Sequence, residues 1–160
     1  MQMLHDLLEK QLRNLYAAET LILERLPEIL NHASDKGLKD IINAIIEVTD
    51  QQRSRLKKIG DYLNFKVTVR DGKIIKGLLE EMKELFEEFS EGNLLDIAII
   101  SQLQHIQHFQ ISAYESTLLY TKTLLLEEIS SILDDTIDEA YMANENCSRY
   151  MKLLLSRKKR

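Results

Sequence analysis

The sequence predicts an all-α protein in which four long helices form a bundle and a fifth, shorter helix lies in one of the connections. Two observations lead to this fold class. Pro27 is the only proline among 160 residues, glycines are few, and Leu, Ile, Glu and Lys dominate, a composition that favours long helices. Apolar residues also recur with a helical period in four long segments. Because this length suits one sizeable core, we expect a single domain spanning residues 1–160.

The first long helix is expected over residues 3–31, where an apolar stripe contains one carboxylate. The stripe consists of Leu4, Leu8, Leu12, Leu15, Glu19, Ile22, Leu26 and Leu30. Pro27 lacks a backbone N–H and should bend this helix. The polar stretch that follows, up to Gly37, ends the helix and offers Ser34 or Asp35 as the N-cap of the next one.

The second long helix is expected over residues 36–64, with an inner face formed by Leu38, Ile41, Ile45, Val48, Gln52, Leu56, Ile59 and Leu63. Residues 65–73 interrupt the helical pattern, and Asp71-Gly72 among them is a turn signal. A short amphipathic helix should then cover residues 74–89.

The last two long helices are expected over residues 94–122 and 126–155. The inner face of the first of these carries Ile99, Ile100, Leu103, Ile106, Gln107, Gln110, Ile111, Tyr114 and Leu118. The inner face of the second carries Ile129, Leu133, Thr136, Ala140, Ala143, Asn144, Cys147, Met151 and Leu154.

The lengths of the connections predict the topology. The breaks between the first two long helices and between the last two are short, so each pair should form an antiparallel hairpin. Residues 65–93 between the hairpins are long enough to cross from one end of the bundle to the other. Two antiparallel hairpins joined by a long crossover that contains a short fifth helix is the ferritin-like arrangement. The alternative is an up-down bundle with an extra helix.

Charge and composition exclude several classes of function. A net charge of −5 gives no reason to expect nucleic-acid binding. The sequence contains no stretch of eighteen apolar residues, so no membrane span is expected. Cys147 is the only cysteine, so an intrachain disulfide is impossible and a cytoplasmic location is expected. The basic residues that follow Ser156 are interpreted as a solvated helix end, with a nucleic-acid or lipid contact as the alternative.

Inward-facing polar residues are expected to share one layer of the bundle. Counting outward from the two hairpin turns brings together Glu19, Gln52, Gln107, Gln110 and Asn144, with Thr136 nearby. A buried carboxylate needs a partner, a metal or a proton, and amides can donate hydrogen bonds to it. Amides are weak ligands of divalent metals, so we expect a buried Glu/Gln/Asn network, with no catalytic residue, no cofactor and no metal. Binding of a small polar ligand in this layer is a further possibility that the sequence leaves undecided.

Two other features have competing interpretations. His105 and His108 are spaced like a pair of metal ligands, but they lie on the helix side opposite the apolar stripe and are expected to be solvated. The short helix carries an apolar stripe of Leu78, Leu79, Met82, Leu85, Phe86 and Phe89. This stripe is expected to cap one flank of the core, with a lipid or partner surface as the alternative.

Several motifs resemble the YciE/YciF-type ferritin-like stress proteins. The segment from Leu15 to Glu19 is similar to the first-helix Tyr-x-Ala-Glu motif of that family. Matches to the patterns of the later helices occur at Thr49, Gln52, Arg55-Leu56, Gly77-Leu78, Asp96, Ala98, Gln104, His108 and Ala113-Tyr114. The resemblance covers nearly the whole chain and implies a di-iron or related metal centre in the bundle.

The departures from that family pattern concern the metal ligands. In place of the histidine, glutamates and aspartate of the pattern, the chain carries Ile45, Val48, Gln107, Gln110, Ala140 and Asn144. Only Glu19 stays acidic, and Ile45 and Val48 are expected to fill core positions. We therefore predict a non-catalytic, stress-associated bundle that acts as a homodimer or beside a family paralogue. The alternative is an iron or other divalent-metal protein with an unorthodox site around Glu19.

Overall fold

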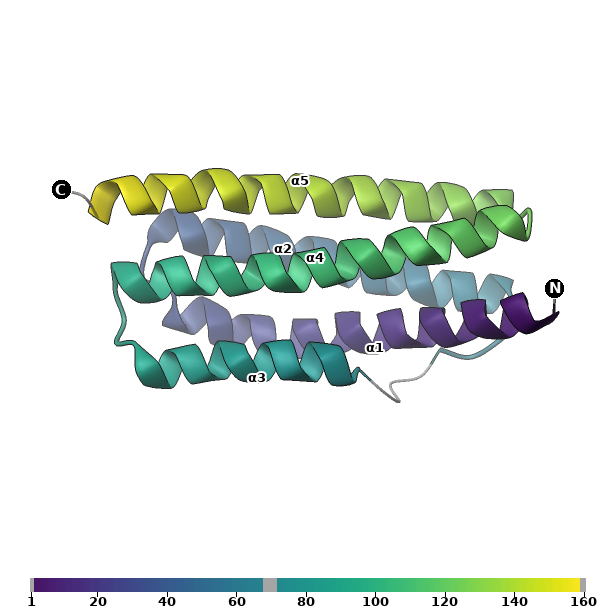
Figure 1. The fold of residues 1–160 in the computed structure, drawn as a ribbon, viewed down its shortest axis with the longest axis horizontal. Coiled ribbons are helices and arrows are strands. Elements are labelled where there is room, and N and C mark those ends of the chain that lie inside the picture. The colour runs from purple at the N-terminus through teal and green to yellow at the C-terminus, as the bar shows by residue number, and fades with distance from the viewer. Residues whose placement is uncertain (1, 68–71, 159–160) are drawn as a thin grey trace.

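The computed structural model is a bundle of five α-helices, and it describes residues 2–67 and 72–158 (Figure 1). The helices are α1 (Gln2–His32), α2 (Lys36–Tyr62), α3 (Lys73–Glu88), α4 (Asn93–Thr123) and α5 (Glu127–Lys158). This part of the chain contains no β-strand. The largest difference from the expected bounds is the end of α5, at Lys158 rather than Leu155. Pro27 lies inside α1 without ending it.

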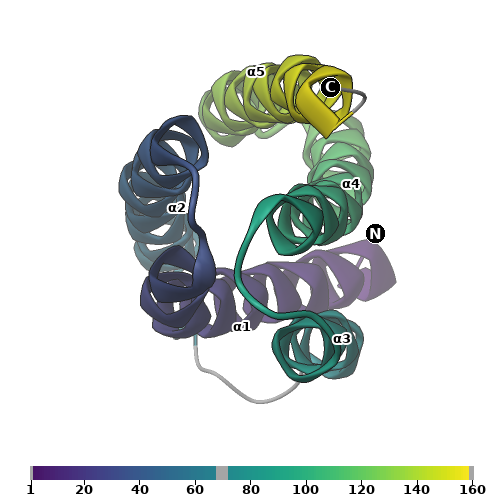
Figure 2. The same ribbon diagram turned by 90° about the vertical axis from the view of Figure 1, so that its left-hand side faces the viewer.

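The helices are connected as two antiparallel hairpins, α1–α2 and α4–α5. The chain leaves α2 at one end of the bundle and enters α4 at the other, and α3 covers most of the distance (Figure 1). Viewed along the bundle, α1, α2, α5 and α4 surround the core, and α3 lies outside against α1 and α4 (Figure 2). The ferritin-like arrangement is therefore confirmed, and the up-down bundle is wrong because α2 and α4 run in the same direction.

The predicted turn before α3 is described only in part. Asp71 lies outside the described residues, whereas Gly72 is the N-cap of α3. Its φ of +102° lies in the left-handed region that glycine adopts without strain. In the described residues, no helix is long and apolar enough to cross a membrane.

The core consists of two apolar clusters along the bundle. One surrounds Ile22, Leu26 and Leu103, and the other surrounds Leu12, Leu56 and Leu133. The apolar stripe of α3 joins the first cluster through Ile75, Leu79 and Met82, which are at most 5% exposed. The short helix therefore caps the core, as its stripe predicts. Glu19 and Gln110 lie in sequence between members of the two clusters, and the polar layer separates them.

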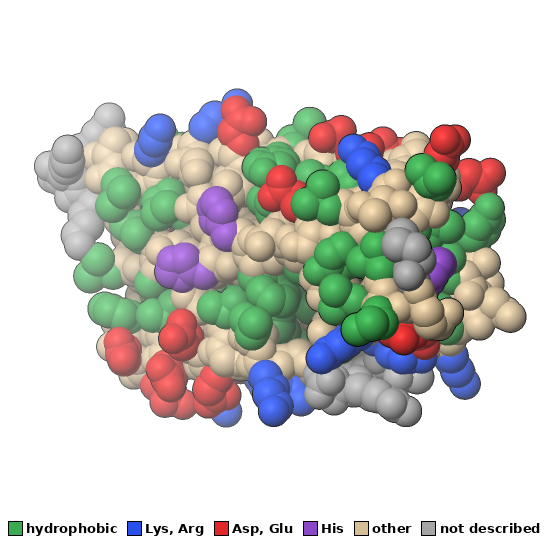
Figure 3. All heavy atoms as spheres, turned by 45° about the vertical axis from the view of Figure 1, so that its right-hand side comes forward, with side chains coloured by type: hydrophobic (Ala, Val, Ile, Leu, Met, Phe, Trp, Pro, Cys, Tyr) green, Lys and Arg blue, Asp and Glu red, His purple; other side chains and the backbone are tan. Residues whose placement is uncertain are grey.

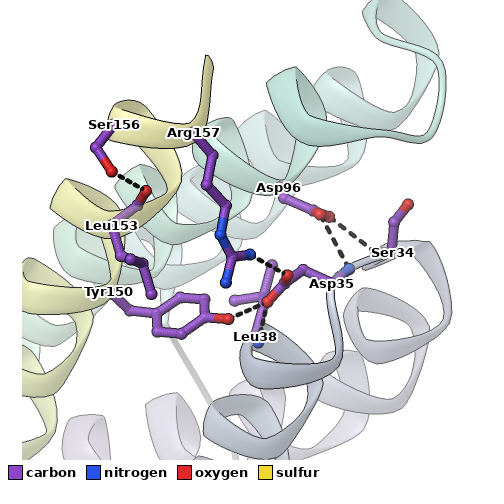
Figure 4. A network of polar contacts seen from close by, with 8 residues as sticks. All are labelled: Ser34, Asp35, Leu38, Asp96, Tyr150, Leu153, Ser156 and Arg157. Carbon is purple, nitrogen blue, oxygen red and sulfur yellow. Dashed lines mark hydrogen bonds and ion pairs between the residues drawn. The ribbon is translucent and has the colours of Figure 1, made fainter. Parts of the chain in front are cut away.

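Side chains from α4 and α5 hold the α1–α2 turn (Figure 4). Asp96 of α4 is 2% exposed, and its two carboxylate oxygens accept hydrogen bonds from the backbone N–H groups of Ser34, at 2.8 Å, and Asp35, at 3.0 Å. Asp35 is the N-cap of α2, because its side chain accepts a hydrogen bond from the N–H of Leu38. Four helices therefore meet at this turn.

The same turn gives one residue of the basic tail a partner. The guanidinium of Arg157 lies 2.8 Å from a carboxylate oxygen of Asp35, so this residue pairs across the bundle while its side chain, 48% exposed, also remains at the solvated end of α5. The hydroxyl of Tyr150 donates to the same carboxylate. A Cβ atom at Gly37 would collide with the Tyr150 ring, which explains why the smallest residue stands there. Lys159 and Arg160 lie outside the described residues.

Candidate functional site

Glu19 is the centre of the candidate site. It lies midway along α1, and its side chain is fully buried. One carboxyl oxygen, Oε1, accepts a hydrogen bond of 2.7 Å from Nε2 of Gln110 on the facing helix α4. The other oxygen, Oε2, has no hydrogen-bond partner among the described residues. A fully buried carboxyl group with a single neutral donor is poorly compensated for the loss of water.

Burial therefore changes the protonation of this residue. Loss of solvation raises the pKa of Glu19 from 4.5 to about 8, and the hydrogen bond from Gln110 opposes this only weakly. At pH 7 the carboxyl group is mostly protonated and carries an O–H donor instead of a charge. The pKa of Tyr114 is also raised well above its usual value, first by burial and then by the nearby Glu19.

Three residues of α4 line the same layer, at a spacing that places them on one face of the helix. They are Gln107, Gln110 and Tyr114, all less than 8% exposed. Gln107 Nε2 donates to the Sγ of Cys147 at 3.6 Å, whereas Gln107 Oε1 and the Tyr114 hydroxyl have no partner among the described residues. Burial raises the pKa of the Cys147 thiol, so this cysteine is a core residue, as expected.

The remaining two predicted layer residues do not bond to Glu19. Gln52 of α2 is buried, at 3% exposure, but no hydrogen bond joins it to Glu19 in the described part of the chain. Asn144 of α5 is half-buried, and its Oδ1 accepts a hydrogen bond from Gln104 Nε2 at 3.2 Å. This contact lies between α4 and α5, because Asn144 faces α4. The structure thus brings Glu19 and Gln110 together and leaves Asn144 in a separate contact.

An ion pair next to this layer was not predicted. Arg55 of α2 and Glu139 of α5 form a bidentate pair with N–O distances of 2.6 and 2.9 Å, and Arg55 also donates to the Thr136 hydroxyl at 3.3 Å. Both charged side chains are about one-third exposed. The signal was present, since Gln52 and Arg55 are three residues apart and so are Thr136 and Glu139, which extends the polar layer by one turn on each helix.

The histidines do not approach the layer. His105 and His108 are exposed on α4, as their position opposite the apolar stripe predicts, and histidine side chains are visible at the surface in Figure 3. The ring of His105 contacts Gln102 at 2.9 Å, and His32 stacks on Phe86 with the ring centroids 3.9 Å apart. Among the described residues, no three His, Cys, Asp or Glu side chains gather in a group that could hold a metal ion.

The donor set of the layer is a poor fit to the di-metal centre that the resemblance implies. Two divalent ions bring about four positive charges, which such bundles balance with several carboxylates and two histidines. Here one carboxyl group, kept neutral by burial, stands among amides and a phenol. Ile45 and Val48 are half-buried and border a groove between α2 and α5. Ile45 also packs against the first core cluster, as expected, whereas Val48 is not among the described residues of either cluster.

Comparisons with known proteins agree with this fold. The family described as Domain of unknown function (DUF892) matches residues 3–159. Protein YciF from Escherichia coli (strain K12) is 24% identical over 140 residues, which cover 87% of this chain and 84% of YciF. The crystal structure of the E. coli stress protein YciF superposes with a TM-score of 0.92 at 21% identity, covering 98% of this chain and 99% of that one. YcfI from Rhodopseudomonas palustris gives a TM-score of 0.87 at 28% identity, over 91% and 92% of the two chains. Since the family match spans almost the entire sequence, the protein belongs to the DUF892 family and is a YciF-like, ferritin-like helical bundle.

Proposed function

We propose that this protein is a non-catalytic ferritin-like bundle with a structural or interaction role, in which a degenerate metal layer is held by a proton instead of a metal. It acts in the cytoplasm, in association with stress, as a homodimer or beside a metal-competent paralogue. The observation that carries the proposal is the environment of Glu19, which is fully buried, receives one neutral hydrogen bond and has a pKa of about 8.

The physical argument concerns charge balance. A carboxylate that binds a metal is ionised, and the metal lowers its pKa by supplying positive charge. Arg55 borders this layer, and its guanidinium is already bonded by both carboxylate oxygens of Glu139. Protonation therefore neutralises Glu19 at the lowest cost in free energy. A carboxyl group that is protonated at pH 7 is a poor metal ligand.

The names given to two relatives are consistent with a structural, stress-associated role. YciF is called a stress protein, and a structural role has been suggested for YcfI. Neither description names a substrate. The chain has the fold of these relatives, but amides and apolar residues stand where the family pattern has acidic metal ligands. This combination is consistent with a function that depends on the surface of the molecule.

Metal analysis tests the proposal directly. The protein is purified without chelators, and iron, manganese and zinc are measured per chain, with Glu19→Gln as the matched variant because it keeps the shape and removes the acid. We expect well under one metal ion in both proteins. Near-stoichiometric metal in the unmodified protein that disappears in Glu19→Gln would refute the proposal.

A second candidate, a single-metal protein with an unorthodox site around Glu19, is favoured by one observation. Three buried polar atoms, Glu19 Oε2, Gln107 Oε1 and the Tyr114 hydroxyl, have no partner among the described residues. Iron or another divalent metal that bound them would raise the melting temperature in proportion to the logarithm of its concentration. This candidate requires that rise in the unmodified protein and its loss in Glu19→Gln; equal melting temperatures with and without metal would exclude it.

A further inference from the structure

Two histidines on the outer side of α4 form a pair that the proposed function does not use. His105 and His108 are three residues apart and both are exposed. Residues at this spacing lie on the same side of a helix, with their Cβ atoms about 5–6 Å apart. The Glu-x-x-His motifs of metal-binding helical bundles present two ligands at the same spacing. The pair can therefore reach a single metal ion from outside the bundle.

The ring of His105 is oriented by Gln102, one turn earlier on α4. Gln102 is 5% exposed, and its Nε2 donates to the backbone carbonyl of Leu78 at 2.8 Å and to a carboxylate oxygen of Glu81 at 3.2 Å, both on α3. A carbonyl and a carboxylate only accept hydrogen bonds, so the amide nitrogen must face them. The amide oxygen, Oε1, therefore faces the ring of His105.

This contact selects one tautomer of His105. The ring nitrogen Nδ1 lies 2.9 Å from Oε1 of Gln102, an oxygen that only accepts, so Nδ1 carries the proton and donates it. The neutral ring then keeps its lone pair on Nε2. Histidine ligands of metals are held in the same way, because one ring nitrogen donates its proton to an oxygen while the other binds the ion. The carboxylate of Glu81 lies behind Gln102 and favours a cation in front of the ring.

Imidazole nitrogens also determine the class of ion. They suit the later first-row divalent metals, such as nickel, copper and zinc, whereas magnesium and calcium prefer oxygen ligands. We propose that His105 and His108 bind one such ion at the surface of α4, with Gln102 as a positioning residue. Among the described residues no group of three acidic, histidine or cysteine ligands exists, so water molecules complete the coordination shell and the ion exchanges readily.

This surface site goes beyond the proposed function and does not depend on it. An exchangeable ion is removed when the protein is washed in metal-free buffer, so the metal that is retained through purification reports on the core. Metal in the core would disappear in Glu19→Gln, whereas metal at the surface would disappear in His105→Gln. Failure of one proposal can therefore be distinguished from failure of the other.

Titration of the full chain with zinc, followed by isothermal calorimetry near neutral pH, tests the site. We expect one zinc ion per chain, and each of His105→Gln and His108→Gln should raise the dissociation constant by about tenfold or more. The double variant should lose this binding. His5→Gln removes an exposed histidine from α1 and is the control, which should leave the dissociation constant unchanged. Circular dichroism verifies that each variant is folded.

Gln102→Leu tests the positioning role. Leucine keeps an apolar side chain in this buried place but cannot accept the proton of His105 Nδ1, so the dissociation constant for zinc should rise by about 10- to 100-fold. Two-bond ¹H–¹⁵N NMR spectra of the metal-free protein, recorded where the ring is neutral, report the tautomer. The proton of His105 should lie on Nδ1 in the unmodified protein and move largely to Nε2 in Gln102→Leu, a change that a purely structural role of Gln102 would not produce.

Three results would overturn the proposal. The first is an unmodified protein that binds zinc no more tightly than the double variant, or only with a dissociation constant above about 1 mM. The second is an effect of His5→Gln as large as that of His105→Gln, which would place the ion elsewhere. The third is a His105 ring that carries its proton on Nε2 in the unmodified protein, or a Gln102→Leu variant with unchanged tautomer and unchanged affinity.

Discussion

Replacing Glu19 with glutamine should make the protein more stable, and the gain should depend on pH. In the unfolded chain this carboxyl group releases its proton near pH 4.5, whereas in the folded protein it keeps the proton until about pH 8. Between these two values the unfolded state binds fewer protons than the folded state, so the free energy of unfolding falls as pH rises. Below pH 4.5 and above pH 8 both states bind the same number, and the contribution is constant.

The size of the effect follows from the same two pKa values. At about 1.4 kcal/mol per pH unit, the interval from 4.5 to about 8 corresponds to a loss on the order of 5 kcal/mol by pH 8. Glutamine cannot ionise, and its carbonyl oxygen can still accept the hydrogen bond from Gln110. The stability of Glu19→Gln relative to the unmodified protein should therefore increase by about 4 kcal/mol between pH 5 and pH 8.

Urea unfolding of both proteins at pH 5, 6, 7 and 8 measures this difference, and other ionisable groups cancel because they are common to both chains. Glu24→Gln, at an exposed position on the same helix, is the control. Its free energy of unfolding, plotted against pH, should run parallel to that of the unmodified protein. A Glu19→Gln curve that also runs parallel to the unmodified protein within about 0.5 kcal/mol would refute the reasoning. It would mean that Glu19 is ionised in the folded state and has a cationic partner.

Three further experiments test other contacts, with urea unfolding as the measurement. Asp96→Ala leaves two backbone N–H groups of the α1–α2 turn without acceptors and should cost about 2–4 kcal/mol, whereas Asp96→Asn should cost less because it keeps one acceptor oxygen. Gly37→Ala should push the Tyr150 ring away from the turn and cost about 1–3 kcal/mol; Gly77→Ala, where a Cβ meets nothing, should be neutral or stabilising, and equal effects would contradict this account. A double-mutant cycle on the Arg55 ion pair between α2 and α5 should give a coupling of about 1 kcal/mol, because both side chains are partly solvated, and a coupling near zero would show that the pair is only geometric.

The helices and their connections could be predicted because they follow from local patterns. Amphipathic period, the scarcity of proline and glycine, and the lengths of the connections all act within one segment or between neighbouring segments. The buried polar layer could also be predicted, because Glu19 interrupts an apolar stripe and Gln110 occupies the inner face of α4. Asp35 as the N-cap of α2 is a local feature of the same kind.

The contacts within the layer could not be predicted because they depend on how each helix is rotated about its axis. Helical spacing places Asn144 on the inner side of α5, but a small rotation decides whether its amide faces Glu19 or, as observed, Gln104 on α4. The pairing of Arg157 with Asp35 likewise requires the end of α5 to lie beside a turn 122 residues earlier in the sequence. Neither the Asn144–Gln104 contact nor the Arg157–Asp35 pair follows from a local sequence pattern.

The hydrogen bond between Glu19 and Gln110 also bears on how uniquely the two hairpins are aligned. It joins residues 91 positions apart, and it is surrounded along the bundle by leucine and isoleucine side chains that could pack almost as well after a slip of one helical turn, about 5.4 Å. Such a slip would bury both polar groups against hydrocarbon, so the bond selects one register out of several that the apolar residues alone would tolerate. Glu19→Leu with Gln110→Leu should then be stable yet conformationally heterogeneous, with more than one set of amide resonances in its NMR spectrum, and a single sharp set would rule this out. Glu19 would thus help to determine which bundle the chain forms, whether or not a metal binds there.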